Sequence, residues 1–138
     1  MFIAPKLQTI SFFDTVDLSS NKTLVSQKIT SAFKVKRVRA SFPSGVNRLM
    51  RLHFYIVGTP ETPTTEPPIG TNILKPIGQV DFLTGDDNEI SIEHEIISPD
   101  SNKYIAVYAT NADVYDHTIE CQVTIEYLEL DSNLKELT

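Results

Sequence analysis

Cysteine, tryptophan and long apolar runs are scarce or missing in this sequence, and each absence limits what the chain can do. The one cysteine, Cys121, excludes an internal disulfide and is typical of a reducing compartment. No stretch approaches the roughly 18 apolar residues of a membrane helix, so we expect no membrane partner. The residues after Met1 lack the basic start and apolar run of a signal peptide, so none is expected. Without tryptophan, an aromatic platform for sugars or single-stranded nucleic acid is less expected.

The motifs of common catalytic and cofactor sites are missing as well. The sequence has no Gly-x-Ser-x-Gly elbow, no phosphate-binding glycine loop, and no cysteine and histidine spaced as metal ligands. Carboxylate pairs such as Glu93 with Glu95 alternate along predicted strands, where solubility explains them. We therefore expect no enzymatic activity and no cofactor.

The sequence is instead rich in segments where apolar and polar residues alternate with the period of a β-strand. The most regular is 117–130, in which every second residue from Ile119 to Tyr127 is apolar. Between Val35 and Val38 the apolar phase slips, which predicts a β-bulge or a bend. No segment of ten or more residues shows helical spacing. The other predicted strands are 7–13, 23–29, 31–42, 48–57, 80–83, 89–97 and 103–110.

Seven or eight strands separated by turn signals predict an all-β fold. We expect an antiparallel β-sandwich with jelly-roll-like topology and little or no helix. Residues 1–138 are predicted to form a single domain, with a Pro-rich loop or arm at 58–78 and a short C-terminal tail at 131–138. The cupin type of jelly roll carries a metal on clustered histidines. The three histidines of this chain are far apart, which argues against such an enzyme.

Charge is distributed unevenly along the chain. Residues 1–57 hold nine of the twelve basic residues, and residues 58–138 hold sixteen of the eighteen acidic ones. We expect basic and acidic strands to lie side by side in one sheet; the alternative is that oppositely charged halves meet between subunits. The net charge of −6 argues against a nucleic-acid partner. The basic strand 31–42 is therefore expected to be a solvated face, with nucleic-acid binding as the alternative.

Three places carry side chains capable of chemistry, and each has a structural interpretation that we prefer. Cys121 is expected to be an inert buried thiol. His94 lies among isoleucines and is expected to be a hydrogen-bonded core residue, with a metal ligand as the alternative. Asp113, Asp116 and His117 stand together in one loop, and Asp86, Asp87 and Asn88 in another. Either loop could hold a cation, but turn formation accounts for both.

Two segments are expected to make contacts with other proteins. The Pro-rich loop, with Pro63, Pro67 and Pro68, is predicted to be a presented contact loop. Near the C-terminus, Leu128 and Leu130 continue the polar phase of the last strand and therefore point away from the layer that buries Ile125. Leu134 and Leu137 follow on the tail. We expect these four leucines to dock on a neighbouring subunit or on the surface of a partner protein; the alternative is that they fold back on their own sandwich.

In its size, lack of helix, Pro-rich loop at 58–78 and regular strands ending in a polar tail, the chain resembles the β-sandwich structural proteins of tailed-phage virions, such as capsid decoration (cementing) proteins. The resemblance implies a non-enzymatic homo-oligomer that binds a capsid or other virion protein. Its expected location is the virion, assembled in the host cytoplasm. Two alternatives remain: a ligand-binding jelly roll that recognises carbohydrate or a receptor through Tyr104, Tyr108 or Tyr115, and a metal-dependent jelly-roll enzyme.

Overall fold

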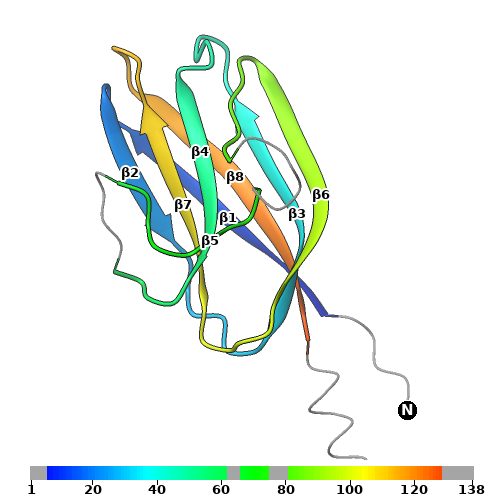
Figure 1. The fold of residues 1–138 in the computed structure, drawn as a ribbon. Helices are drawn as coiled ribbons and strands as arrows, with labels where there is room; N and C mark the ends of the chain where they lie inside the picture. Colours follow the sequence, from blue (N-terminus) through cyan, green and yellow to red (C-terminus); the bar gives the residue numbers. More distant parts are fainter. Residues whose placement is uncertain (1–5, 62–65, 75–80, 129–138) are drawn as a thin grey trace, which may run out of the picture.

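The computed structural model describes residues 6–61, 66–74 and 81–128, and these form two antiparallel sheets packed face to face (Figure 1). This confirms the predicted all-β sandwich. The described residues contain no helix, and hence none long and apolar enough to cross a membrane. The strands are β1 (Lys6–Val16), β2 (Ser20–Val25), β3 (Phe33–Phe42), β4 (Met50–Val57), β5 (Thr71–Asn72), β6 (Asn88–Ser98), β7 (Tyr104–Asn111) and β8 (His117–Tyr127).

The strand order is that of a jelly roll. One sheet has the order β1-β8-β3-β6 and the other β2-β7-β4-β5. The first strand therefore pairs with the last, the second with the seventh, the third with the sixth and the fourth with the fifth, as in a long hairpin rolled around a core. Residues 17–19, 43–49 and 112–116 cross between the sheets at the upper end in Figure 1, called the loop end below. Lys6 and Tyr127 pair at the opposite, terminal end.

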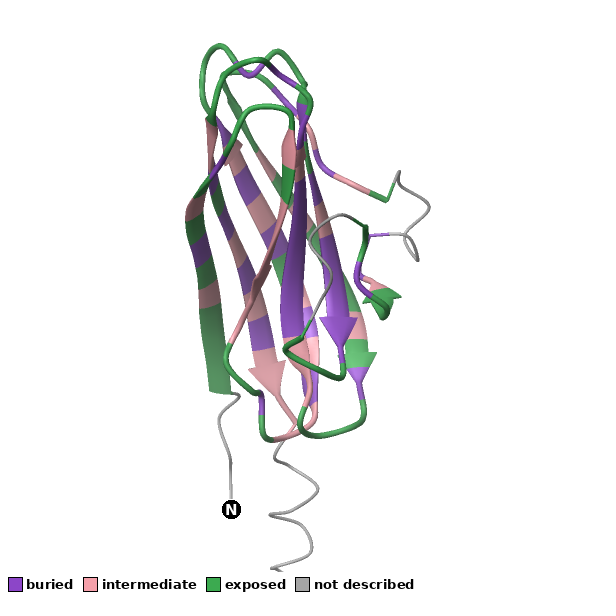
Figure 2. Cartoon of the chain, turned by 90° about the vertical axis from the view of Figure 1, so that its left-hand side faces the viewer, coloured by how far each residue is buried: buried purple, intermediate pink, exposed green. Residues whose placement is uncertain are grey.

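The core lies between the two sheets because each strand alternates its side chains. In β8, Ile119 to Ile125 are buried at every second position. Burying one such large side chain stabilises the fold by about 1.5–3 kcal/mol. β7 is buried on both faces, and Figure 2 shows it as one of the most continuously buried strands. Its outer face forms a second small apolar cluster, whose buried members are Tyr55, Val57, Ala106 and Tyr108.

The described parts of the Pro-rich loop pack against the sheet of β2, β7, β4 and β5. Just after the loop, the Phe82 ring lies 5.6 Å from the His53 ring, and the Arg51 guanidinium lies 4.6 Å from the Phe82 ring centroid. Two loop residues, Ile73 and Leu74, are buried in the main core. The predicted strand at 80–83 is wrong for its described part, since only Leu83 makes an isolated bridge, to Leu52. The short β5 within the loop was not predicted.

The phase slip predicted in 31–42 is a β-bulge. The register of β3 shifts between Val35 and Arg37 against both β8 and β6. Along β6, two residues lie between the partners of Val35 and Arg37, and His94 is one of them. His94 is exposed, so the prediction of a core histidine is wrong. The irregular pairing turns the middle of β6 outward although its sequence alternates.

Basic and acidic strands lie side by side, as preferred from the sequence. Lys34 bridges Glu95 at 3.2 Å and Glu126 at 3.5 Å, so β3 is tied to β6 on one side and β8 on the other. Arg39 bridges Glu89 at 2.6 Å. Ion pairs at the protein surface are weakened by water and salt, so these bridges neutralise the face more than they stabilise it.

Candidate interaction surface

Four large apolar side chains at the loop end are exposed to solvent. They come from three loops that are joined by backbone hydrogen bonds. The main-chain nitrogen of Ser19 donates to the Asp113 carbonyl at 2.9 Å, and that of Ala112 donates to the Leu49 carbonyl at 2.9 Å. The loop-end surface consists of Leu18, Leu49, Val114 and Tyr115, exposed by 51%, 39%, 67% and 69%.

Asn111, at the end of β7, holds these loops together from within. It is 2% exposed. Its side-chain nitrogen donates to the carbonyls of Val16, Asp17 and Tyr115 at 3.2, 3.3 and 2.8 Å. Its side-chain oxygen accepts from the Asp113 main-chain nitrogen at 3.0 Å. Buried polar groups are costly unless paired, so this side chain fixes the loops of β1–β2 and β7–β8 against each other.

The loop residues considered for a cation bind protein groups instead. His117 Nε2 donates to Asp113 Oδ2 at 2.7 Å, and Asp113 Oδ1 accepts from the Val114 main-chain nitrogen at 2.7 Å. Asp116 Oδ1 accepts from the Leu18 main-chain nitrogen at 2.8 Å. Over residues 6–61, 66–74 and 81–128, no three histidine, cysteine or acidic side chains are grouped as metal ligands. The three residues position Leu18 and Val114 at the surface.

The second acidic loop has a similar structural role. Asp86 Oδ1 accepts from the main-chain nitrogens of Gly45 and Asn47 at 2.9 and 3.1 Å, which caps the loop between β3 and β4. A side chain at Gly85 would place its Cβ 2.1 Å from the Asn88 side-chain oxygen, so it would displace the Asn88 side chain, which now accepts from the Asp86 main-chain nitrogen. Asp86 therefore serves the turn formation preferred from the sequence.

The pairing of Asp113 predicts an acid-dependent part of the stability. The hydrogen bond from His117, and then that from the Val114 N–H, hold the pKa of the Asp113 carboxyl below its ordinary value of 3.8. Because the folded-state pKa is lowered, the stabilisation is present above the unfolded-state pKa and is lost as pH falls through the folded-state value. We expect Asp113→Asn to melt earlier than wild type at neutral pH, with a smaller difference in strong acid. Calorimetry from about pH 7 to pH 2 measures this difference, and a constant difference across that range contradicts it.

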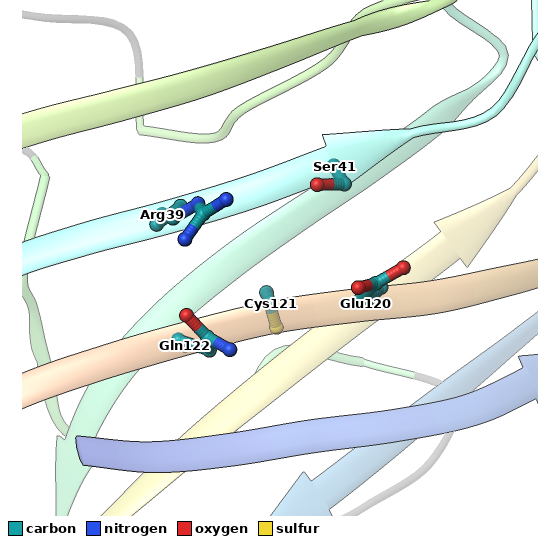
Figure 3. Close-up of a pocket in the computed structure, with 5 residues that line it drawn as sticks. All are labelled: Arg39, Ser41, Glu120, Cys121 and Gln122. Carbon is teal, nitrogen blue, oxygen red and sulfur yellow. The ribbon is translucent and has the colours of Figure 1, made fainter.

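Cys121 is buried, as expected. It is 2% exposed, and burial raises the pKa of its thiol to about 12. It borders a hollow of about 30 Å³ on the outer face of β3 and β8, room for about one water molecule. Figure 3 shows the polar residues around this hollow, with Arg39 and Ser41 on β3 and Glu120 and Gln122 on β8.

The low reactivity expected of the Cys121 thiol can be tested with a disulfide reagent. At about pH 8 the thiolate fraction of Cys121 is very small, so a disulfide reagent is expected to modify almost no native protein within an hour. In denaturant the reagent is expected to modify one thiol per chain. Stoichiometric modification of the native protein within minutes contradicts the buried placement.

The structure describes only some of the residues that the sequence predicts as contacts. Pro67 is exposed and Pro68 buried, and the neighbouring Ile69 is 94% exposed. Leu128 is half-buried, and its main-chain nitrogen donates to the Ala32 carbonyl at 2.9 Å. Beside it at the terminal end lies a hollow of about 380 Å³, lined by Lys6, Leu7, Gln8, Thr30, Ser31 and Tyr127. Pro63, Leu130, Leu134 and Leu137 lie outside the described residues, so their contacts stay a prediction.

Of the three tyrosines considered for a ligand platform, Tyr115 alone is exposed. Tyr108 is buried, and Tyr104 is half-buried beside it in the second apolar cluster. Leu18, Leu49 and Val114 could not be identified from the sequence, because single apolar residues in polar loops form no periodic pattern. Asn111 could not be identified either, because its partners are up to 95 positions away.

No protein-family model and no curated protein sequence matches the chain. Among solved structures, it aligns with the VP2 subviral particle of infectious bursal disease virus at TM-score 0.46 and 7% identity, covering 91% of this chain and 33% of that one. It aligns with the mitogen of Yersinia pseudotuberculosis at TM-score 0.43 and 10% identity, covering 88% and 86%. It aligns with a Bacillus endospore appendage protein at TM-score 0.36 and 9% identity, covering 90% and 89%. The chain thus spans about a third of the viral protein. Likeness at these TM-scores carries no argument about function.

Proposed function

We propose that the chain is a non-enzymatic structural protein of a virion, which docks on a protein lattice and associates with copies of itself. The observation that carries the proposal is the loop-end surface. Its four apolar side chains are exposed on three loops that hydrogen bonds hold together. Neighbouring exposed apolar side chains of this kind mark contacts with other proteins.

The hydrogen bonds that hold these loops favour binding through a surface that is already ordered. Asn111 and the Asp113–His117 pair order the backbone around Val114 and Tyr115 before any partner arrives. A preordered surface loses less conformational entropy on binding, which strengthens association. Tyrosine is also among the residues that most often dominate protein interfaces.

The architecture supports the virion location by analogy alone. Jelly rolls form viral capsid domains, and also lectins and cupins. The exposed tyrosine at the loop end is a single ring, whereas a sugar platform of the predicted kind needs the tyrosines that are buried or half-buried here. The loop-end residues thus favour a protein partner over a sugar.

The proposal is tested on the purified chain and on particles from the source of the sequence. Light scattering measures self-association, and co-sedimentation through a density gradient measures binding to particles. We expect the chain to self-associate and to travel with the particles at a fixed ratio to the coat subunit. A chain that stays at the top of the gradient while a glycan array shows strong binding through Tyr115 contradicts the proposal. So does a bound metal together with a catalytic activity.

The C-terminal leucines, which we propose as a further contact, can be tested by truncation. Truncation after Tyr127 removes Leu128 and the tail but leaves β8 intact. We expect a domain that folds with near-normal melting temperature and assembles less well. A truncated chain that assembles normally, or one that fails to fold, contradicts this role.

A further inference from the structure

β1 lies at the edge of its sheet, and among the described residues one of its two edges is free. β1 pairs with β8 along its whole length without a register shift, and nothing described pairs with its other edge within that sheet. Most of its residues are exposed, as the strand above the N label in Figure 2 shows. An edge strand presents unpaired N–H and C=O groups, so a long regular edge is a template for another strand.

The other sheet edges of the described structure are poorer templates. β5 has two residues and β2 six. β6 is as long as β1, but its pairing with β3 is bulged and its exposed residues include Glu93 and Glu95. Short strands, bulges and charges are the means by which proteins protect edges from pairing. By contrast, β1 has Leu7 and Phe13 exposed by 60% and 75%.

We propose that β1 pairs antiparallel with β1 of a second copy around a two-fold axis, so that two four-stranded sheets become one continuous sheet. The proposal names the contact between copies in the proposed function and rests on it to that extent. A two-fold contact of this kind uses the same surface on both subunits. Because the axis stands perpendicular to the sheet, the outer faces of both copies stay on the same side.

The sequence of β1 is complementary to itself in one register, centred on Ile10. In that register Leu7 lies opposite Phe13 of the second copy, and Lys6 lies opposite Asp14 of the second copy. Each pair occurs twice across the axis. Directly opposite apolar pairs and opposite charges stabilise antiparallel strands. Asp14 already binds Lys22 at 2.7 Å, but its side chain is 38% exposed and can accept a second cation.

Other registers lose this complementarity. Shifting the pairing by two residues in either direction separates Lys6 from Asp14 and Leu7 from Phe13. A shift that places odd residues opposite even ones turns the apolar side chains of the two copies to opposite faces. The charges on β1 therefore specify one register as well as one partner.

The test is a charge exchange followed by sedimentation equilibrium. Lys6→Asp and Asp14→Lys each place like charges opposite one another, so each is expected to raise the dimer dissociation constant at least about tenfold. The double variant restores opposite charges in the same register and is expected to return within about threefold of wild type. Because Asp14→Lys also breaks the bridge to Lys22, thermal unfolding of each variant confirms that the fold is kept.

A matched pair of edge variants separates β1 from the rest of the surface. Phe13→Lys on β1 is expected to abolish the dimer, and Ile97→Lys on the β6 edge, a residue 60% exposed, is expected to leave it unchanged. Three results would overturn the inference. They are a charge-exchange double variant that dimerises as weakly as the single variants, equal effects of the lysine substitutions at the two edges, and a wild-type chain that is monomeric at all concentrations. If the chain is monomeric but still binds particles, the lattice-docking part of the proposed function stands. If the chain dimerises through β1 but binds no particles, only the lattice-docking part is overturned.

Discussion

Replacing Asn111 by alanine is expected to cost on the order of 3 kcal/mol of the free energy of unfolding. The change leaves the carbonyls of Val16, Asp17 and Tyr115 and the Asp113 N–H without the side-chain amide that now pairs with them. A buried polar group left unpaired costs about 1–3 kcal/mol, and water entering at the loop end offsets part of the sum. The melting temperature is expected to fall by about 10 °C. Thermal and urea unfolding measure both quantities.

Asn88→Ala is the matched control for this substitution. Asn88 is exposed, and its side-chain oxygen accepts one hydrogen bond, from the Asp86 main-chain nitrogen at 2.8 Å. We expect a cost of about 1 kcal/mol or less, since water replaces a bond lost at the surface. Equal losses in the two variants would show that the Asn111 side chain does not hold the loops.

The second large effect is expected on binding. Val114→Ser with Tyr115→Ser removes the two most exposed apolar side chains of the loop-end surface. Residues that dominate an interface cost about 2 kcal/mol or more each when truncated, so the loss of both is expected to lower the affinity for particles roughly a thousandfold. The free energy of unfolding is expected to change by less than about 0.5 kcal/mol, because both side chains are exposed. Co-sedimentation at graded concentrations measures the affinity.

Ile97→Ser controls for a general loss of surface apolarity. Ile97 is 60% exposed on β6, away from the loop end. We expect its affinity for particles to equal that of wild type. Loss of binding in this variant, or full binding in the Val114 and Tyr115 variant, places the contact elsewhere on the chain.

Much of the fold follows from the local sequence because half-buried strands alternate. The pattern of β8 predicts its buried face from Ile119 to Ile125, and the slip between Val35 and Val38 predicts the bulge of β3. The exposure of His94 could not be predicted in this way. β6 alternates without a break, and the residues opposite the bulge turn outward only because of how β3 pairs with its neighbours.

The loop end shows a similar limit to prediction from sequence. Asp113, Asp116 and His117 stand out as a cluster, but the same residue types can bind a cation or hold a loop through hydrogen bonds. Their hydrogen-bond partners decide between these roles, and Leu18, whose main-chain nitrogen donates to Asp116, is 98 positions away. The sequence likewise predicts that basic and acidic strands such as β3 and β6 are neighbours. It does not predict that Arg39 pairs with Glu89, because that pairing depends on the strand register.

Hydrogen exchange of the chain, free and bound to purified particles, tests the central claim that the loop end docks on a protein lattice. Exchange is expected to slow on binding in residues 17–19, 47–49 and 112–116, which carry or adjoin the loop-end surface. The turn at 99–103, at the terminal end of the sandwich, is expected to exchange at the same rate in both states. Unchanged exchange at the loop end in particle-bound protein, or protection confined to the turn at 99–103, would contradict the account.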